Sequence, residues 1–151
     1  MTSVKLEGFA ELDQALAELS KAAGKGVLRR SLKKAAEPMA AIARGMAPRE
    51  TGGLAATVGY GTRLTKRQAG MHRKMFRDDR ASVEGFVGAN HPAAVPQEFG
   101  TIHHGPQPFM RPAFDQDVMP MLDRLKSELA TEIDKAVARA ARRAARMAAK
   151  G

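Results

Sequence analysis

The stretch from residue 112 to residue 137 reads PAFDQDVMPMLDRLKSELATEIDKAV, and it predicts the longest regular element of the chain. Its large apolar residues recur at steps of three and four positions, which is the spacing of one face of an α-helix. Pro112 suits the first helical turn, and Asp115 and Asp117 suit the positive end of the helix dipole. We therefore predict one long amphipathic helix from Pro112 onward, whose apolar face contains Val118, Met121, Leu122, Leu125, Leu129, Ile133 and Val137.

The continuation of this helix has a different composition. After Asp134 no further acid occurs, and almost no large side chain is available for packing. We predict that residues 135–151 form a basic helical extension of one domain that covers residues 1–134. Its basic residues alternate with alanines, and they are Lys135, Arg139, Arg142, Arg143, Arg146 and Lys150.

Two helices are predicted near the N-terminus from apolar residues at helical spacing. The first covers Phe9 to Ala23 and is broken by Gly24 and Gly26. The second continues to Pro48, with a kink at Pro38 because proline lacks the N–H that a helix interior needs. Their apolar positions are Leu12, Leu16 and Leu19 in the first, and Leu28, Leu32, Ala35, Met39, Ile42 and Met46 in the second.

The middle of the chain predicts a small antiparallel sheet. Tyr60–Leu64 and Ser82–Ala89 look extended, and they flank a basic stretch, residues 62–81, that we interpret as a long hairpin loop or arm. His91–Thr101 carries two prolines and a closing glycine, which favours a short edge strand or loop over a helix. The fold class predicted is therefore α+β, with the two leading helices and the long C-terminal helix packed on this sheet.

The composition narrows the partners. Twenty-five Lys and Arg residues against sixteen Asp and Glu residues give a net charge of +9, which favours anionic partners such as nucleic acid, acidic protein surfaces or membrane headgroups without choosing among them. The absence of cysteine excludes a disulfide framework and a thiolate metal site, and fits assembly in a reducing cytoplasm. Met1–Glu7 lack a signal-peptide pattern and no segment is apolar enough to span a bilayer, so we expect no membrane partner. Trp is absent and Tyr occurs once, which indicates a modest core.

The residues that could support catalysis do not form a recognisable set. Adjacent His103 and His104 lack a second group of ligands at the usual spacing, and no glycine-rich phosphate loop is present. We therefore expect no enzyme activity, no metal and no cofactor. A metal-dependent hydrolase using His103, His104 and Glu98 remains the weakest alternative, and the other candidates considered were His91, Asp78 and Asp79.

Three short stretches in this order carry a family resemblance. They are APRETGGL at Ala47–Leu54, EFGT at Glu98–Thr101 and QPFMRPAF at Gln107–Phe114, followed by the long helix. Together they resemble the tail-completion or neck proteins of long-tailed phages, typified by the gene-ten product of the HK-type siphophages. The resemblance covers about Leu6 to Leu129, and the family pattern Pro-x-x-Thr-Gly-x-Leu is matched by Pro48, Thr51, Gly52 and Leu54.

The resemblance implies a non-enzymatic virion protein of the head-tail junction, assembled in the host cytoplasm. It implies helices on a short antiparallel sheet, and one copy in a ring, six-fold by analogy, around the tail axis. The implied partners are further copies of the chain and adjacent neck and tail proteins such as a tail terminator, the tail tube or the head connector, with packaged DNA in the channel as a further candidate. The basic arm is longer than the family pattern implies. The alternative hypothesis is a DNA-binding accessory protein that acts through the arm and the C-terminal helix.

Two groups of residues follow as candidate sites. We expect Arg111 to pair with Glu98, and Phe99, Phe109 and Phe114 to anchor a core or a subunit interface. The assembly or fold group is Pro48, Thr51, Gly52, Leu54, Glu98, Phe99, Gly100, Thr101, Gln107, Pro108, Phe109, Arg111, Pro112 and Phe114. The group for DNA or partner contact is Arg63, Lys66, Arg67, Arg73, Lys74, Arg77, Arg139, Arg142, Arg143 and Arg146.

Overall fold

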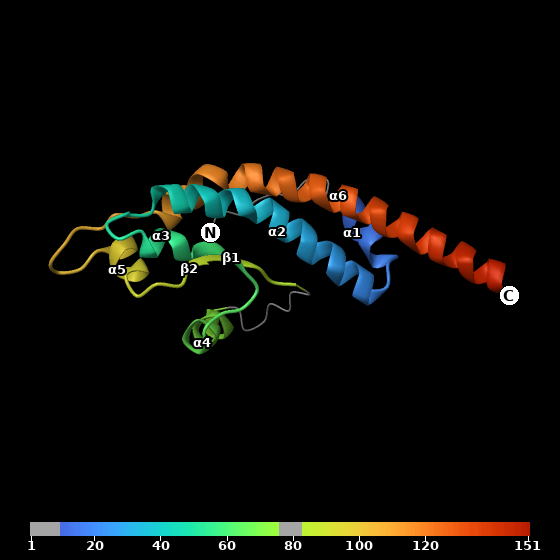
Figure 1. The fold of residues 1–151 in the computed structure, drawn as a ribbon, viewed down its shortest axis with the longest axis horizontal. Helices are drawn as coiled ribbons and strands as arrows, with labels where there is room; N and C mark the ends of the chain where they lie inside the picture. The colour runs from blue at the N-terminus through green and yellow to red at the C-terminus, as the bar shows by residue number, and fades with distance from the viewer. Residues whose placement is uncertain (1–9, 76–82) are drawn as a thin grey trace.

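A computed structural model describes residues 10–75 and 83–151 of the chain. Two long helices lie side by side and form the body of an elongated molecule, with a small sheet and short helices at one end (Figure 1). None of the described helices is long and apolar enough to cross a membrane. In chain order the elements are α1 (Ala10–Ala17), α2 (Lys21–Met46), α3 (Gly53–Thr57), β1 (Val58–Gly61), α4 (Lys66–Met75), β2 (Phe86–Ala89), α5 (Ala94–Phe99) and α6 (Met110–Lys150).

The long C-terminal helix is confirmed. α6 begins at Met110, two residues before the predicted start, so Pro112 stands in its first turn where no helical N–H is required. α6 runs antiparallel to α2, and ion pairs fix the register between them. Nε of Arg30 lies 2.6 Å from the Glu132 carboxylate, which is buried.

The first helix was predicted too long. α1 ends at Ala17 and α2 begins at Lys21, so Gly24 lies inside α2. The physical reason is the cap at Ser20, whose side-chain oxygen accepts a hydrogen bond from the N–H of Ala23 at 3.3 Å. A Cβ on Gly24 would lie 3.8 Å from the carbonyl oxygen of Leu16, an ordinary van der Waals distance, so the packing of α1 beside α2 does not require glycine at this position. Phe9 lies outside the described residues.

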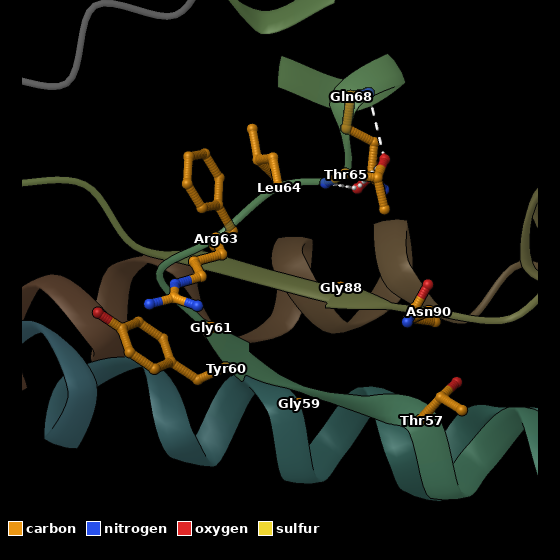
Figure 2. A pocket seen from close by; sticks show the side chains of 12 residues that line it. Thr57, Gly59, Tyr60, Gly61, Arg63, Leu64, Thr65, Gln68, Gly88 and Asn90 are labelled. Atoms are coloured by element: carbon orange, nitrogen blue, oxygen red, sulfur yellow. Dashed lines mark hydrogen bonds between the residues drawn. The ribbon is translucent and has the colours of Figure 1, made fainter.

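The antiparallel strand pair and the α+β class are confirmed, although the first strand covers Val58–Gly61 rather than Tyr60–Leu64 and the second begins at Phe86 within the predicted segment. β1 pairs with β2, with Val58 opposite Ala89 and Gly61 opposite Phe86. The loop predicted for residues 62–81 is wrong for part of its length, because α4 occupies Lys66–Met75. A reciprocal cap explains it: the Thr65 hydroxyl accepts from the N–H of Gln68, and the Gln68 side chain accepts from the N–H of Thr65 (Figure 2). Arg77, Asp78 and Asp79 lie outside the described residues.

The prediction of a strand or loop for residues 91–101 is also wrong. α5 covers Ala94–Phe99 within that segment. Pro96 is the third residue of the helix, where its missing N–H costs nothing because the first-turn N–H groups have no partner inside the helix. Nδ1 of His91 accepts a hydrogen bond from the N–H of Ala93 at 3.1 Å, which fixes the turn before α5.

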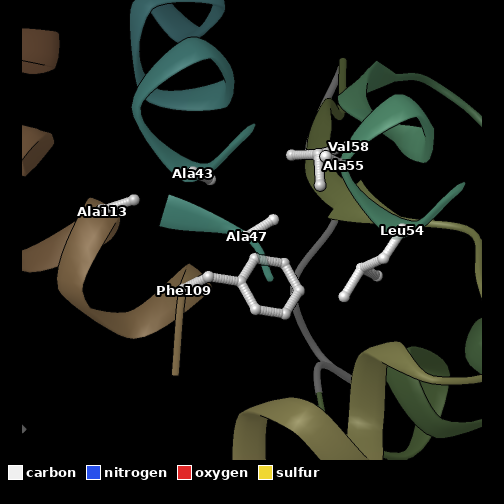
Figure 3. Packing of buried hydrophobic residues seen from close by; sticks show 7 residues of the cluster. All are labelled: Ala43, Ala47, Leu54, Ala55, Val58, Phe109 and Ala113. Carbon is white, nitrogen blue, oxygen red and sulfur yellow. The ribbon is translucent and has the colours of Figure 1, made fainter. Parts of the chain in front are cut away.

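Two apolar clusters lie in the core; the first is rich in alanine, and the second consists mainly of leucine and β-branched side chains. The first surrounds the completely buried Phe109 at the sheet end, where α2, α3, β1 and α6 meet (Figure 3). The second lies between α1, α2 and α6 around Val27 and Ile133. Between the clusters, the Arg124 guanidinium pairs with the buried carboxylate of Asp117 at 2.5 Å and donates to the carbonyl oxygen of Ala35 at 3.0 Å.

Candidate functional site

The first motif stretch is far from the other two in sequence, but all three meet at one end of the fold. Gly52 precedes α3 with φ of +73°, a conformation that favours glycine. Leu54, two residues after Gly52, is buried in the cluster around Phe109 together with Ala47 (Figure 3). The second stretch closes α5, and the third opens α6. This end of the molecule is therefore the place where the motif residues act together.

Glu98 is the connecting residue. Its buried carboxylate accepts hydrogen bonds from the backbone N–H groups of Phe109 at 2.8 Å, Met110 at 2.9 Å and Arg111 at 3.0 Å. N–H groups at the start of a helix have no partner within the helix, and a negative charge there is stabilised by the helix dipole. Glu98 therefore caps α6 from another helix and fixes α5 against it.

Arg111 completes this connection. Its Nε lies 3.1 Å from the Glu98 carboxylate, and its Nη2 donates to the Glu98 carbonyl oxygen at 3.0 Å. The same guanidinium lies 4.9 Å from the centre of the Phe99 ring. The predicted pairing of Arg111 with Glu98 is thus present within the chain. Because the Arg111 side chain is 59% exposed, the ion pair itself adds little stability, and the capping bonds matter more.

The ionisation of Glu98 reflects two opposed effects. Burial raises the pKa of the carboxyl, while the hydrogen bonds from Met110, Phe109 and Arg111 lower it. The hydrogen bonds prevail, so the pKa of Glu98 lies below its ordinary value. Glu98 is therefore a charged capping group at neutral pH, and its oxygens are occupied by α6.

The loop between α5 and α6 is held by hydrogen bonds from both its backbone and the Thr101 side chain. The Thr101 hydroxyl accepts hydrogen bonds from the N–H groups of His103 and His104, each at 3.2 Å. The N–H of Gln107 donates to the carbonyl oxygen of Gln97 at 2.7 Å, which closes the base of the loop. His103 and His104 are exposed on this loop. Within residues 10–75 and 83–151, no group of three His, Cys, Asp or Glu side chains could hold a metal ion.

The comparisons with known proteins decide the family. Residues 10–100 match the model of the HK97-gp10-like family, described as "Bacteriophage HK97-gp10, putative tail-component". The chain belongs to this HK97-gp10-like family. Its role is therefore structural and tail-related, and the chain is a virion protein. Phage tail components are a structural class and not an enzyme class. No curated protein and no solved structure matches the chain.

The family match and the motif geometry overlap only partly. The match ends at Gly100, so the HK97-gp10-like region contains the first motif and most of the second. The third motif and all of α6 follow it. Glu98 lies inside the matched region and its three N–H partners lie outside, so the cap joins the family region to the long helix.

The end of the molecule where the three motifs meet also exposes large apolar side chains. Val95, Phe99 and Ile102 are 66%, 65% and 94% exposed, although α5 and the following loop are firmly held. We call these three residues the apolar tip. Of the three phenylalanines predicted as anchors, Phe109 is in the core, whereas Phe99 and Phe114 are exposed. The sequence predicted a role for Phe99 but not for Val95 and Ile102, because their exposure depends on how α5 and the following loop are fixed in the fold.

The basic residues predicted for DNA or partner contact are not brought together. Arg63 lines a hollow of about 250 Å³ beside the sheet, with α4 next to it (Figure 2). The C-terminal arginines, at positions 139–146, belong to the distal part of α6, and the C-terminus of α6 lies at the opposite end of the molecule from the sheet (Figure 1). All of these basic residues are exposed, apart from Arg77, which lies outside the described residues.

An apolar hollow of about 450 Å³ was not predicted from the sequence. It lies between α2, the sheet and the start of α6, and its lining includes Tyr60, Met110 and Phe114. The Tyr60 hydroxyl is buried and has no hydrogen-bond partner among the described residues, and burial raises its pKa. No sequence signal could have located this hollow, because its lining comes from four separate segments.

Replacing Gly100 by alanine will destabilise this end of the fold by about 1 to 3 kcal/mol. Gly100 has φ of +79°, and a Cβ there would lie 2.9 Å from the backbone nitrogen of Pro106. Gly105→Ala in the same loop is the matched control, because a Cβ at Gly105 meets nothing within 4 Å. Urea denaturation followed by circular dichroism measures both. Equal stability of the two variants would show that the backbone of Gly100 is not constrained.

Proposed function

We propose that the chain is a tail-completion subunit that forms a ring at the head-tail junction of a long-tailed phage and joins the tail to the head connector. The observation that carries this proposal is the end of the molecule where the motifs are packed together and joined by hydrogen bonds, and where the apolar tip is exposed. Adjacent copies, the tail tube, a tail terminator and the head connector are the partners that this role requires. Six subunits would match the symmetry of a long tail.

The apolar tip has the properties that a repeated contact needs. A ring of identical subunits is held by one heterologous contact, in which a surface of one copy meets a different surface of the next. Large apolar side chains on a preorganised backbone lose little conformational freedom when they bind, and they supply the anchor residues of an interface. Phe99 and Ile102 are the two largest side chains of the apolar tip, and the Glu98 cap and the Thr101 bonds hold their backbone.

Polar replacement of the tip will remove assembly without unfolding the subunit. We expect the double substitution F99S/I102S to leave the circular dichroism spectrum unchanged and its Tm within a few degrees, because both side chains are exposed. In a complementation assay with phage that lack the gene, the yield of infectious particles should fall at least about 100-fold, the effect of losing hot-spot contacts worth roughly 3 kcal/mol.

The matched control replaces exposed apolar residues at the other end of the molecule. Val137 is 52% exposed and Met147 69% exposed, and both lie on the distal part of α6. V137S/M147S should complement like the natural chain. Normal complementation by F99S/I102S would contradict a role for the tip, and the ring would then need another contact.

The position in the virion is tested by electron cryo-microscopy of intact particles. We expect the head-tail junction to contain a symmetric ring into which this chain fits, with the tip at the contact between copies. Density at the junction that is fully accounted for by other chains would overturn the proposed position. The family assignment to a tail component would be unaffected by that result, because it rests on the sequence match alone.

A further inference from the structure

The distal part of α6 is an isolated helix. α6 continues past α1 and the beginning of α2, and its last turns have no other element beside them (Figure 1). Every residue from Val137 to Gly151 is exposed. This segment also lies beyond the residues matched by the family model, so the family assignment does not explain it.

The cations among residues 135–151 share one face of α6. A helix turns by about 100° per residue and rises by 1.5 Å, so six positions spaced by 4, 3, 1, 3 and 4 residues fall within an arc of about 100° along roughly 22 Å. These positions alternate with alanines on the other faces, and no acid occurs among residues 135–151. We call the six residues the basic face; they are Lys135, Arg139, Arg142, Arg143, Arg146 and Lys150.

The basic face is electrostatically unbalanced. Lys135 lies 3.6 Å from the Glu132 carboxylate, but among the described residues no carboxylate pairs with the other five cations. Like charges three and four residues apart on a helix repel, at roughly 0.2–0.5 kcal/mol per pair. Upstream on α6 the pattern is different, because Glu128 and Glu132 pair with Lys34 and Arg30 of α2. A linear polyanion would relieve the repulsion along the whole basic face at once.

The opposite side of the helix argues against a protein or membrane partner. Apart from Val137 and Met147 it carries only alanine, and it has no aromatic or leucine side chain. Protein interfaces depend on large buried anchors, and interfacial membrane helices insert Trp, Phe or Leu side chains. A row of arginines without such anchors instead fits a partner that is bound mainly by charge. Phosphates along a nucleic acid backbone provide that charge continuously.

We propose that the basic face of α6 is a binding site for the phosphate backbone of duplex DNA, without sequence preference. Four of its six cations are arginine, whose planar guanidinium donates to two phosphate oxygens at once. The proposal stands on this helix alone and does not depend on ring formation. In a tail protein, DNA binding by α6 would place this helix where the genome passes. It would also give a function to the excess positive charge of the chain.

Fluorescence polarisation of a labelled 30-base-pair duplex tests the proposal with the full chain. If four to six phosphates are neutralised, the logarithm of the association constant should fall with the logarithm of the salt concentration with a slope of about −4 to −5. R139Q/R142Q/R143Q/R146Q should weaken binding at least about 100-fold in 0.1 M salt and make the slope shallower by about 3 to 4. Glutamine preserves helix propensity, and circular dichroism checks that α6 remains folded.

The control removes the same charge from the other basic region. R63Q/K66Q/R67Q/R73Q changes four exposed cations on and beside α4 and leaves α6 intact. It should bind DNA within a few-fold of the natural chain. Loss of binding in this control together with retention in the α6 variant would overturn the proposal. Absence of duplex binding by the natural chain in 0.05 M salt would also overturn it, and tight binding to poly-L-glutamate in that case would identify an acidic protein as the partner.

Discussion

Replacing Phe109 by alanine will reduce the free energy of unfolding by about 3 to 5 kcal/mol, the usual cost of truncating a fully buried phenylalanine. Phe109 is 0% exposed, and it is the largest side chain among the fully buried residues. Its neighbours in the cluster are mainly alanines, which cannot move far enough to fill the space that the ring would leave (Figure 3). For a domain with 5 to 15 kcal/mol of stability, this is a large fraction of the total.

Phe99→Ala is the comparison that separates the core phenylalanine from an exposed one. Phe99 is 65% exposed, and its main contact is the Arg111 guanidinium above its ring. Its truncation should cost about 1 kcal/mol or less. Guanidinium denaturation with a common slope for all variants measures the difference. Similar losses for the two variants would mean that Phe109 is not the centre of this cluster.

Replacing Glu98 by alanine will cost about 3 kcal/mol or more, because three N–H groups at the start of α6 lose a charged acceptor together. No other side chain within the described residues accepts from these three N–H groups. Glu128→Ala is the control, since Glu128 makes only a solvent-exposed pair with Lys34 and its loss should have a small effect. Thermal unfolding monitored at 222 nm gives both values. Equal values would contradict the capping role of Glu98.

The pH dependence of stability follows from the same group. The pKa of Glu98 is lowered in the fold, so its contribution is complete above the ordinary value of 4.5 and is lost as the pH falls through the lowered pKa. The pKa of Glu132 is also lowered in the fold, mainly because of its hydrogen bond from Arg30. Stability should therefore decline below about pH 4.5, and the decline should be smaller in Glu98→Gln, which cannot titrate at this position. An identical decline in Glu98→Gln would show that Glu98 is not linked to folding.

The mispredicted elements have two physical causes. Side-chain caps at Ser20 and Thr65 determine where α2 and α4 begin, whereas α5 has no side-chain cap and can form because Pro96 lies in its first turn. A capping bond depends on which N–H a side chain can reach, so composition alone does not reveal it. Pro96 is tolerated because it lies in the first turn of α5. If α5 began one residue earlier, Pro96 would lie beyond the first turn, where its missing N–H would cost a helical hydrogen bond.

The motif residues illustrate a second limit of sequence reasoning. The pairing of Arg111 with Glu98 could be predicted from opposite charges in neighbouring motifs. The three N–H bonds to Glu98 could not, because they require α5 and α6 to meet at one point after a ten-residue loop. The exposure of the apolar tip depends on the same geometry. Phe99 lies just before that loop and is exposed, whereas Phe109 lies at its end and is buried.

By itself, the sequence determined the α+β class, the long C-terminal helix, the antiparallel pairing across the basic segment and the family of this chain. These properties are local or repetitive, since helical periodicity and short motifs are present within a few tens of residues. Only the tertiary structure decided that Glu98 caps α6, that Phe109 alone of the three motif phenylalanines is buried, and that the distal basic face has no neighbour. Each of these depends on which surfaces meet in space, because burial and capping are properties of contacts between segments that are distant in the chain.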